Sequence, residues 1–412
     1  MLAGRLKEKS PPRHSDTPWL DRSGTRPLSA RAKVAVIGGG IAGASLAFAL
    51  RAKGLRPTLF DPGGVGAGAS GNPAGLIMPR IDLGQNADSQ FFAHAYVHSI
   101  ARLRNLSAAG NRNLFNQCGV LQKFKTKEEI ARAKRILAER LLPDGWVEEH
   151  EDGLFFPQGG VVDPGAYCTA LIGDTDLISE RVSRIYNLTD RVEIHASTGL
   201  VRSFDGVIVA NSVAALSFIQ CRTLPLAPVK GQIDLFRGVA PPEHVIICGS
   251  YAAPAPGGGT IIGATYDHSG TQYPDATSVE ATRENICAVG ALIDITPLEV
   301  SGSAPRAAVR CQTPDFLPIA GPIPDWDYFS ACYDGVRTGA RGPFPPAQRI
   351  TNIFILGGLG SRGLVTAPYC ADIIAAAMTG GPAPAERMIA DALDPARFFI
   401  REMKRTRTIR AQ

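Results

Sequence analysis

Three glycines near the N-terminus have the spacing of a nucleotide-binding loop. Gly38, Gly40 and Gly43 form the pattern G-x-G-x-x-G. In this pattern the first glycine allows a tight turn, the second lets a pyrophosphate approach the backbone, and the third lets a helix pack closely against a strand. The helix that follows presents free N–H groups and a partial positive charge to the phosphates. The pattern therefore predicts a dinucleotide at this turn.

The flanking segments support this interpretation. Residues 33–37 are apolar and of strand type, residues 45–50 are typical of a helix, and residues 57–61 indicate a second strand. Asp61 lies 18 residues beyond Gly43 and is suitably placed to bind a ribose hydroxyl. We predict a β-α-β unit at the head of an α/β domain. The spacing alone does not separate NAD from FAD, and a glycine-rich turn without a ligand is the structural alternative.

Two further glycine-rich segments indicate which dinucleotide binds. Residues 66–75 and 352–364 resemble the flavin-contacting loops of the D-amino-acid oxidase and glycine oxidase superfamily. The resemblance implies FAD as the cofactor, with the later loop and its helix facing the pyrimidine edge of the flavin ring. A helix N-terminus at that edge would stabilise the negative charge of reduced flavin.

Five blocks narrow the resemblance. Residues 68–72, 153–160, 228–232, 309–318 and 357–364 are similar to the C-terminal oxidoreductase domain of the bifunctional tRNA 5-methylaminomethyl-2-thiouridine biosynthesis proteins. That family's oxidase removes the carboxymethyl group from 5-carboxymethylaminomethyl-(2-thio)uridine at the tRNA wobble position, giving the 5-aminomethyl nucleoside and glyoxylate. The resemblance thus implies tRNA as the substrate and a methyltransferase domain or subunit as a partner.

The implied substrate carries a carboxylate, which arginine binds well because its planar fork donates two parallel hydrogen bonds. Arg310 occupies the position at which glycine oxidase relatives place a carboxylate-binding arginine, and Arg362 lies in the later flavin loop. We expect both to be catalytic residues. The alternatives are an ion pair of Arg310 with an acid such as Asp315, and a flavin or backbone contact for Arg362.

The resemblance also implies the residues that contact FAD, which come from the glycine-rich segments and one later strand. They are Gly38, Gly39, Gly40, Ala42, Gly43, Asp61, Gly68, Ala69, Ser70, Asn72, Ala74, Gly75, Leu76, Val182, Gly358, Gly360, Ser361, Arg362, Gly363 and Leu364.

Two other groups with chemical potential are interpreted as structural. His94 and His98 have the i, i+4 spacing of a metal pair, but the segment between them lacks a glutamate and no third ligand is evident, so no metal is expected. Cys311 stands beside Arg310, and an ordinary buried thiol is the preferred interpretation over covalent flavin attachment.

Composition and charge set the broad class. Eight cysteines without a CxxC pair, no apolar run of about 20 residues and no signal-peptide core predict a reduced, cytoplasmic protein that does not enter the membrane. The net charge of +5 is uneven: residues 1–33 and residues 397–412 each carry +5, so the body between them carries about −5. Basic ends could guide a polyanion such as RNA, although solvated termini collect charge in any case.

The chain has 412 residues, which is enough for about two or three domains. The strands and helices that must position these groups indicate an α/β fold. We predict a Rossmann-type FAD-binding domain of the D-amino-acid oxidase type, with an inserted antiparallel-sheet α+β substrate domain. The expected FAD-binding domain comprises residues 33–87, 151–225 and 331–400, and the substrate domain comprises residues 88–150 and 226–330. Residues 1–32 are interpreted as a basic, Pro-containing linker or arm, and residues 401–412 as a basic tail. Helices are expected over residues 88–108 and 126–142.

Two other functions share these features. A small-molecule oxidase of glycine, sarcosine or a D-amino acid would need the same fold, cofactor and chemistry. A non-catalytic FAD-binding partner of a separate methyltransferase is the second alternative.

Overall fold

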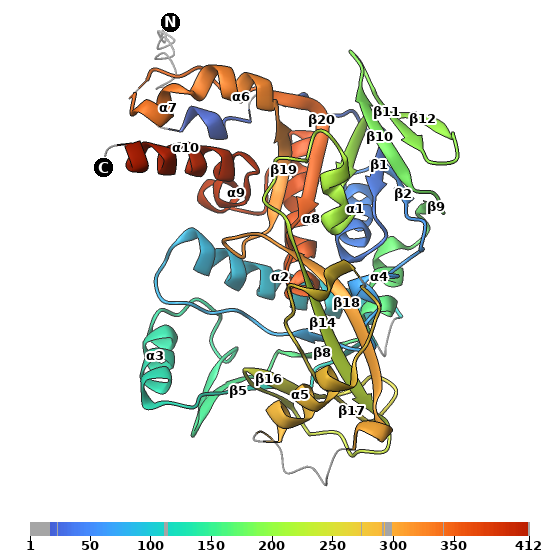
Figure 1. Cartoon of the computed structure of the whole chain (residues 1–412), viewed down its shortest axis with the longest axis vertical. Coiled ribbons are helices and arrows are strands. Elements are labelled where there is room, and N and C mark those ends of the chain that lie inside the picture. Colours follow the sequence, from blue (N-terminus) through green and yellow to red (C-terminus); the bar gives the residue numbers. More distant parts are fainter. Residues whose placement is uncertain are drawn as a thin grey trace, which may run out of the picture.

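The computed structural model describes residues 17–22, 24–110, 114–272, 274–290, 292, 299–340 and 342–410. These residues form four β-sheets and the helices that cover them (Figure 1). Residues 1–16, which hold half of the predicted basic arm, lie outside the described residues.

A six-stranded sheet carries the nucleotide loop. Its order is β19-β20-β13-β1-β2-β9, and its strands are parallel except for the edge strand β19. The strands are β1 (Lys33–Ile37), β2 (Arg56–Phe60), β9 (Asp176–Ile178), β13 (Gly206–Val209), β19 (Ile319–Pro324) and β20 (Arg349–Gly357). The connection from β1 to β2 is α1 (Ile41–Ala52), so the predicted β-α-β unit is confirmed.

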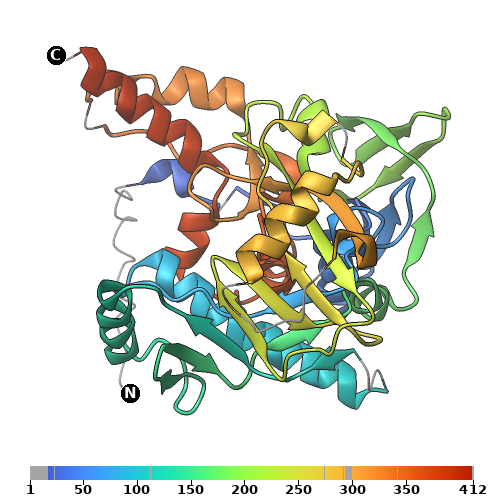
Figure 2. The same ribbon diagram turned by 60° about the horizontal axis from the view of Figure 1, so that its bottom comes forward.

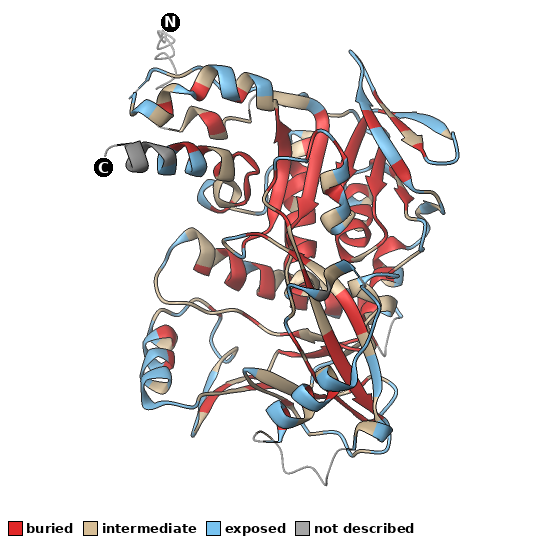
Figure 3. Ribbon diagram, in the orientation of Figure 1, coloured by how far each residue is buried: buried red, intermediate tan, exposed pale blue. Residues whose placement is uncertain are grey.

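Both faces of the central strands of this sheet are buried, which explains why β1 and β13 are apolar without alternation. In β1, Val34 and Val36 enter the larger core, whereas Ala35 and Ile37 enter a second core on the opposite face. Helices α1, α2 (Ala87–Ala108) and α8 (Gly363–Thr379) pack together as part of the larger core. The buried strands and helices form the centre of the upper half in Figure 3.

An eight-stranded sheet forms the other half of the molecule. Its order is β18-β14-β17-β16-β15-β5-β7-β6, with every neighbouring pair antiparallel except β15 and β5. The strands are β5 (Val120–Lys123), β6 (Glu148–His150), β7 (Gly153–Phe156), β14 (Ala227–Phe236), β15 (Val245–Cys248), β16 (Ser250–Pro254), β17 (Thr260–Gly263) and β18 (Ala304–Gln312). Helix α5 (Val279–Val289) packs on this sheet and is seen in front of it in Figure 2.

The remaining elements are smaller. Strands β3 (Gly75–Ile77), β8 (Gly160–Val162) and β4 (Phe115–Asn116) form one three-stranded sheet, and β10 (Val182–Asn187), β11 (Val192–Ala196) and β12 (Val201–Phe204) form another. The other helices are α3 (Lys127–Ala138), α4 (Pro164–Ile172), α6 (Trp326–Tyr333), α7 (Gly335–Thr338), α9 (Arg387–Leu393) and α10 (Ala396–Arg410). The 3-10 turns are η1 (Pro18–Leu20), η2 (Ala69–Gly71), η3 (Ser212–Ser217), η4 (Gly270–Gln272) and η5 (Val300–Gly302).

Local sequence explains several boundaries. Asn86 caps α2 by accepting a hydrogen bond from the Ser89 amide at 2.9 Å, and the predicted helix over 88–108 is confirmed. Thr126 and Glu129 form a capping box that begins α3, which ends at Ala138 and is shorter than the predicted 126–142. Leucine-rich residues beyond it form an extended loop instead.

The predicted fold class is confirmed, because a parallel Rossmann-type sheet is joined to a largely antiparallel second sheet. Strand pairing crosses the predicted domain boundaries in several places, one of which is β4, in the range assigned to the substrate domain, pairing with β8. Strand β7 lies in the range assigned to the FAD-binding domain but pairs in the eight-stranded sheet, and β19 lies in the range assigned to the substrate domain but pairs with β20. The boundaries themselves stay a prediction.

The described part of the predicted N-terminal arm is anchored rather than free. Trp19 is buried against α6, α7 and α10, with its ring 6.0 Å from that of Tyr333. Arg22 donates hydrogen bonds to Asp391 at 2.9 Å and to Asp394 at 3.0 Å. Asp394 also accepts from Arg349 at 3.0 Å. Trp19 and Arg22 thus attach this part of the predicted linker or arm to the C-terminal helices.

Candidate active site

The nucleotide loop closes as its glycines predict. Gly38 has a φ of +120°, and a β-carbon there would lie 2.5 Å from the carbonyl oxygen of Ala210. A β-carbon on Gly43 would lie 1.8 Å from the carbonyl oxygen of Gly38. Only glycine fits these two positions, so that α1 begins directly against the end of β1.

Two side chains from later segments hold this loop. The Asp61 carboxylate accepts hydrogen bonds from the amides of Gly39 at 2.7 Å and Gly63 at 2.8 Å. The Ser70 hydroxyl accepts from the amide of Ile41, in the first turn of α1, at 2.9 Å. A carboxylate has about four acceptor positions. Asp61 therefore keeps capacity for the ribose hydroxyl that its spacing predicts.

The polar groups around the loop fit a bound dinucleotide. The side-chain oxygen of Asn211 is buried without a hydrogen-bond partner among the described residues, next to the turn at Gly38. A buried unpaired acceptor is costly, and a ligand donor would satisfy it. Gly68 has no atom within 4 Å of the position of a β-carbon, so its backbone can be approached. These observations agree with FAD and with the segments predicted to hold it.

The two flavin loops meet at the start of α8. A β-carbon on Gly75 would lie 2.1 Å from Cδ1 of Leu364, and one on Gly363 would lie 3.3 Å from the side chain of Ile41. The amide of Gly360, which has a φ of +56°, donates to the carbonyl oxygen of Cys311 at 2.7 Å. Segments far apart in the sequence thus come together around the N-termini of α1 and α8.

The other predicted cofactor residues lie within these same segments, with one exception. Ala42 is in the first turn of α1, and Ala69, Asn72, Ala74 and Leu76 follow one another from η2 into β3. Gly358 and Ser361 lie between β20 and α8. Val182 begins β10 and packs in the core that also contains Phe60, just before Asp61. Their contacts with FAD stay a prediction.

One face of β18 connects the eight-stranded sheet to both flavin loops. Residues 306, 310 and 312 share a face because side chains alternate along a strand. Arg306 bonds the side chain of Asn72 and donates to the carbonyl oxygen of Gly68 at 2.9 Å. At the other end, Gln312 forms a backbone bridge with Leu359. Arg310 lies between these contacts along the strand and shares its face with Arg306, whose side chain reaches the first flavin loop.

Arg310 has no carboxylate partner among the residues that the structure describes. Its guanidinium donates to the carbonyl oxygen of Thr265 at 3.2 Å and lies 5.6 Å from the ring centre of Tyr266. Burial lowers the pKa of the Arg310 guanidinium, and the ionisable groups that influence it are the hydroxyls of Tyr251 and Tyr266. A half-buried guanidinium without an acid nearby is a ready partner for a ligand carboxylate.

The alternative role of Arg310, an ion pair with Asp315, is wrong. Asp315 bonds Arg397 at 3.1 Å and Arg401 at 2.9 Å, both from α10. Asp315 is five residues beyond Arg310, but it follows the end of β18 and turns toward the C-terminal helix. Arg310 and Asp315 are close in sequence, but Arg310 lies within β18 while Asp315 lies beyond its end, at the side of α10.

Arg362 lies at the N-terminal end of α8 and donates to the carbonyl oxygen of Pro79 at 3.3 Å. Burial, with the nearby positive charge of Arg80, lowers the pKa of the Arg362 guanidinium to about 10. The group is therefore still protonated at neutral pH. Its hydrogen bond to a backbone oxygen matches the alternative role considered for it. Arg362 and Arg310 belong to different elements, the start of α8 and β18.

Sequence reasoning missed residues whose importance depends on strand register. Arg306 fastens the first flavin loop to β18, and Gly231 makes room for the Arg310 side chain, since a β-carbon there would lie 2.4 Å from Nη2 of Arg310. Burial raises the pKa of the Tyr251 hydroxyl, which lies near Arg310, to about 12. The alternation of residues 306, 308, 310 and 312 was the available signal for Arg306.

The remaining sequence candidates, His98 and Cys311, have contacts within the described part of the chain. His98 bonds Asp372 at 2.8 Å, and the described residues contain no group of three or more possible metal ligands. Cys311 is buried in the second core, on the face of β18 opposite Arg310. Burial raises the pKa of its thiol to about 11.

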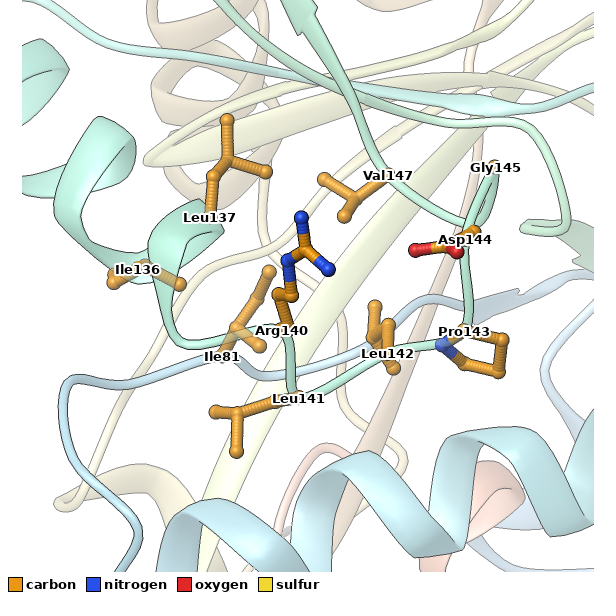
Figure 4. A pocket seen from close by; sticks show the side chains of 10 residues that line it. All are labelled: Ile81, Ile136, Leu137, Arg140, Leu141, Leu142, Pro143, Asp144, Gly145 and Val147. Atoms are coloured by element: carbon orange, nitrogen blue, oxygen red, sulfur yellow. The ribbon is translucent and has the colours of Figure 1, made fainter.

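A separate pocket lies at the end of α3. Its volume is about 160 Å³, and it is lined by Ile81 and by residues 136–137, 140–145 and 147 (Figure 4). None of the predicted site residues lines it. Pockets for drug-sized ligands are typically about 300–1,000 Å³, so this one does not fit the cofactor. No helix in the described ranges is long and apolar enough to cross a bilayer.

Comparison with known proteins assigns the family. Residues 33–377 match the family of FAD dependent oxidoreductases. The chain belongs to this family. It is thus an oxidoreductase whose cofactor is FAD.

Curated relatives of this oxidoreductase are tRNA 5-methylaminomethyl-2-thiouridine biosynthesis bifunctional proteins. The protein from Methylobacillus flagellatus is 30% identical over 410 residues, which cover 93% of this chain and 62% of the relative. The protein from Magnetococcus marinus is 29% identical over 441 residues, which cover 98% of this chain and 64% of the relative. The chain therefore spans less than two thirds of the length of these relatives.

Solved structures share the fold. A glycine oxidase from Geobacillus kaustophilus has a TM-score of 0.68 at 18% identity, over 90% of this chain and 99% of that one. An iminodiacetate oxidase from Chelativorans sp. BNC1 has a TM-score of 0.67 at 21% identity, over 86% of this chain and 97% of that one. At these identities the likeness concerns the fold alone.

Proposed function

We propose that this oxidoreductase removes the carboxymethyl group of 5-carboxymethylaminomethyl-(2-thio)uridine at the wobble position of tRNA. The observation that carries the proposal is the Arg310 guanidinium, which has no acid partner in the described residues and lies on β18 between the contacts of that strand with the two flavin loops. The names of the relatives give tRNA 5-methylaminomethyl-2-thiouridine as the nucleoside that they help to make, and the carboxymethylated precursor is what the family resemblance implies. The additional length of the relatives, which are named as bifunctional, supports a methyltransferase domain or subunit as a partner.

The reaction follows from the substrate's structure, a secondary amine attached to a CH2–COO⁻ group. When bound, FAD supplies an acceptor for the hydride of that methylene carbon. The amine must be neutral, and its proton leaves as the C=N bond forms. Water then adds to this carbon, and cleavage of the C–N bond gives glyoxylate and the primary amine of 5-aminomethyluridine.

The chain's own residues have the task of orienting the substrate. Arg310 would hold the carboxylate through its planar fork and so fix the adjacent methylene carbon. Arg362, which is bonded to Pro79, would add positive charge at the start of α8. The predicted cofactor residues of the nucleotide loop, with Asp61 and Ser70, would hold the adenosine and pyrophosphate end of FAD.

Nucleoside mass spectrometry of tRNA tests the proposal. The purified, FAD-loaded protein is incubated with tRNA that contains the carboxymethylaminomethyl nucleoside, and the Arg310→Ala variant serves as the control. We expect loss of the carboxymethyl group together with stoichiometric glyoxylate. Unchanged tRNA combined with rapid oxidation of glycine or sarcosine would establish a small-molecule oxidase instead. Flavin that none of these compounds reduces would indicate a non-catalytic FAD-binding partner.

A further inference from the structure

Tyr266 is an exposed aromatic residue beside Arg310. Its accessible fraction is 52%. The guanidinium carbon of Arg310 lies 5.6 Å from the centre of its ring. A ligand that covered this ring would bury its apolar surface, which is favourable.

Three contacts hold the Tyr266 ring in place. Its hydroxyl donates a hydrogen bond to the side-chain oxygen of Gln312, the residue that bridges the later flavin loop. The imidazole of His268 packs against it at 77°, with ring centres 5.3 Å apart. On either side of Tyr266, the backbone of residues 265 and 267 is bonded to β14 at Gln232 and Lys230. The ring is therefore positioned before any ligand arrives.

The register of this backbone places Tyr266 opposite Gly231. Lys230 pairs with Asp267 in antiparallel orientation, so Gly231 and Tyr266 are the next opposed pair. The Arg310 guanidinium occupies the space above Gly231. The chain thus forms a small site in which the Arg310 cation lies over the Tyr266 ring, next to the contacts of β18 with the two flavin loops.

We infer that Tyr266 is a specificity residue, on which the uracil base of the substrate stacks while Arg310 holds its carboxylate. The inference rests on the proposed function. Four single bonds separate the carboxylate carbon of the substrate from C5 of the base, a span of roughly 5 Å when extended. The Tyr266 ring centre lies 5.6 Å from the Arg310 guanidinium carbon, so a substrate whose carboxylate is bound to Arg310 can place its base against this ring. Stacking on aromatic side chains is a general means of recognising a base that has left its helix.

The stacking also separates this substrate from small amino acids, because glycine and sarcosine have no ring to place on Tyr266. Loss of a base-stacking aromatic residue typically weakens binding about 5- to 150-fold. Tyr266→Leu should therefore lower kcat/KM for the tRNA nucleoside by about this factor. Tyr266→Phe keeps the ring and should remain within about threefold of the wild type.

The test uses two synthetic substrates that do not require tRNA. N-benzylglycine has a planar ring joined through CH2–NH–CH2–COO⁻, as in the modified uridine, and N-(cyclohexylmethyl)glycine has a saturated ring on the same linker. Flavin reduction under anaerobic conditions gives kcat/KM for each, and flavin absorbance changes give their affinities. We expect the FAD-loaded wild type to prefer the planar ring by about fivefold or more, and Tyr266→Leu to lose this preference.

Tyr186→Leu is the matched control. Tyr186 is also exposed, its ring is 4.7 Å from that of His195, and its hydroxyl contacts Arg184, but it lies in the sheet of β10, β11 and β12. This variant should keep the planar-ring preference. An unchanged preference in Tyr266→Leu, or equal affinity and turnover of both compounds in the wild type, would overturn the inference. Turnover of these compounds with the expected preference, but none of tRNA, would refute the proposed function and leave the stacking role intact.

Discussion

The Arg310 guanidinium occupies the space that a side chain on Gly231 would fill, since a β-carbon there would lie 2.4 Å from Nη2 of Arg310. The same β-carbon would lie 2.9 Å from the carbonyl oxygen of Thr265, to which Arg310 donates. The absence of a side chain at Gly231 in β14 therefore allows the Arg310 guanidinium, from the neighbouring strand β18, to occupy this position. Gly231 thus helps to position Arg310, the residue proposed to bind the substrate carboxylate.

Gly231→Ala should displace the guanidinium and lower kcat/KM about 10- to 100-fold, because a shift near 1 Å at a positioning group has effects of this size. FAD content should remain normal, since Gly231 is in β14 rather than in a flavin loop. Gly302→Ala is the control, as its nearest neighbour would be 3.9 Å from the new β-carbon. Normal turnover by Gly231→Ala would show that Arg310 needs no fixed position.

Arg310→Ala should abolish carboxylate binding while FAD stays bound. Truncating one partner of a desolvated charge pair costs about 2–5 kcal/mol, which corresponds to about 30- to several-thousand-fold in kcat/KM. Arg310→Lys should restore activity only in part, because an ammonium group lacks the planar fork. Steady-state kinetics, flavin content and Tm should be measured together. If kcat/KM is unchanged with full FAD content, Arg310 is not the anchor, and Arg362 becomes the next candidate.

Gly43→Ala should impair FAD retention, because its β-carbon would lie 1.8 Å from the backbone oxygen of Gly38. The helix and strand would have to move apart, and the phosphate site at the start of α1 would open. Gly238→Ala, where no atom lies within 4 Å, should retain the cofactor. The ratio of flavin absorbance to protein absorbance after purification measures the difference. Equal ratios in both variants would contradict the placement of the dinucleotide at this loop.

FAD should be bound without a covalent link. The pKa of the buried Cys311 thiol is raised to about 11, so the nucleophilic thiolate is scarce at neutral pH, and the side chain lies on the face of β18 away from Arg310. Acid precipitation should release all of the flavin into the supernatant. Flavin that remains on the denatured chain of the wild type but not of Cys311→Ser would establish a covalent link.

Arg349→Ala should destabilise the protein strongly. Both Arg349 and its partner Asp394 are almost fully buried, with side-chain exposures of 2% and 0%. Removing one member of a buried pair costs about 3–5 kcal/mol, and we expect the lower end because Arg22 still pairs with Asp394. Arg387→Ala removes a pair at 3.6 Å whose arginine side chain is 71% exposed, and should cost at most about 1 kcal/mol. Urea unfolding followed by fluorescence would show whether the two differ.

The sequence by itself determined the nucleotide loop and the elements around it. The spacing of Gly38, Gly40 and Gly43 requires a strand, a tight turn and a helix in immediate succession, and β1 and α1 follow it. The capping residue Asn86 and the apolar spacing likewise determined α2. Such features are local, because the residues that decide them are within a few positions of one another in the chain.

Only the tertiary structure decided which distant residues meet at the site. Arg306 reaches the Asn72 loop, Gly231 admits Arg310, and Tyr266 stands opposite Gly231, because strand register fixes these neighbours. The same holds for Asp315, which pairs with α10 instead of the nearby Arg310, and for Arg22, which fastens a proline-containing segment to Asp394. If β14 and β18 paired one residue out of register, their sequence patterns would be unchanged, but Gly231, Arg306 and Arg310 would meet other neighbours. Composition and spacing therefore could not predict these contacts.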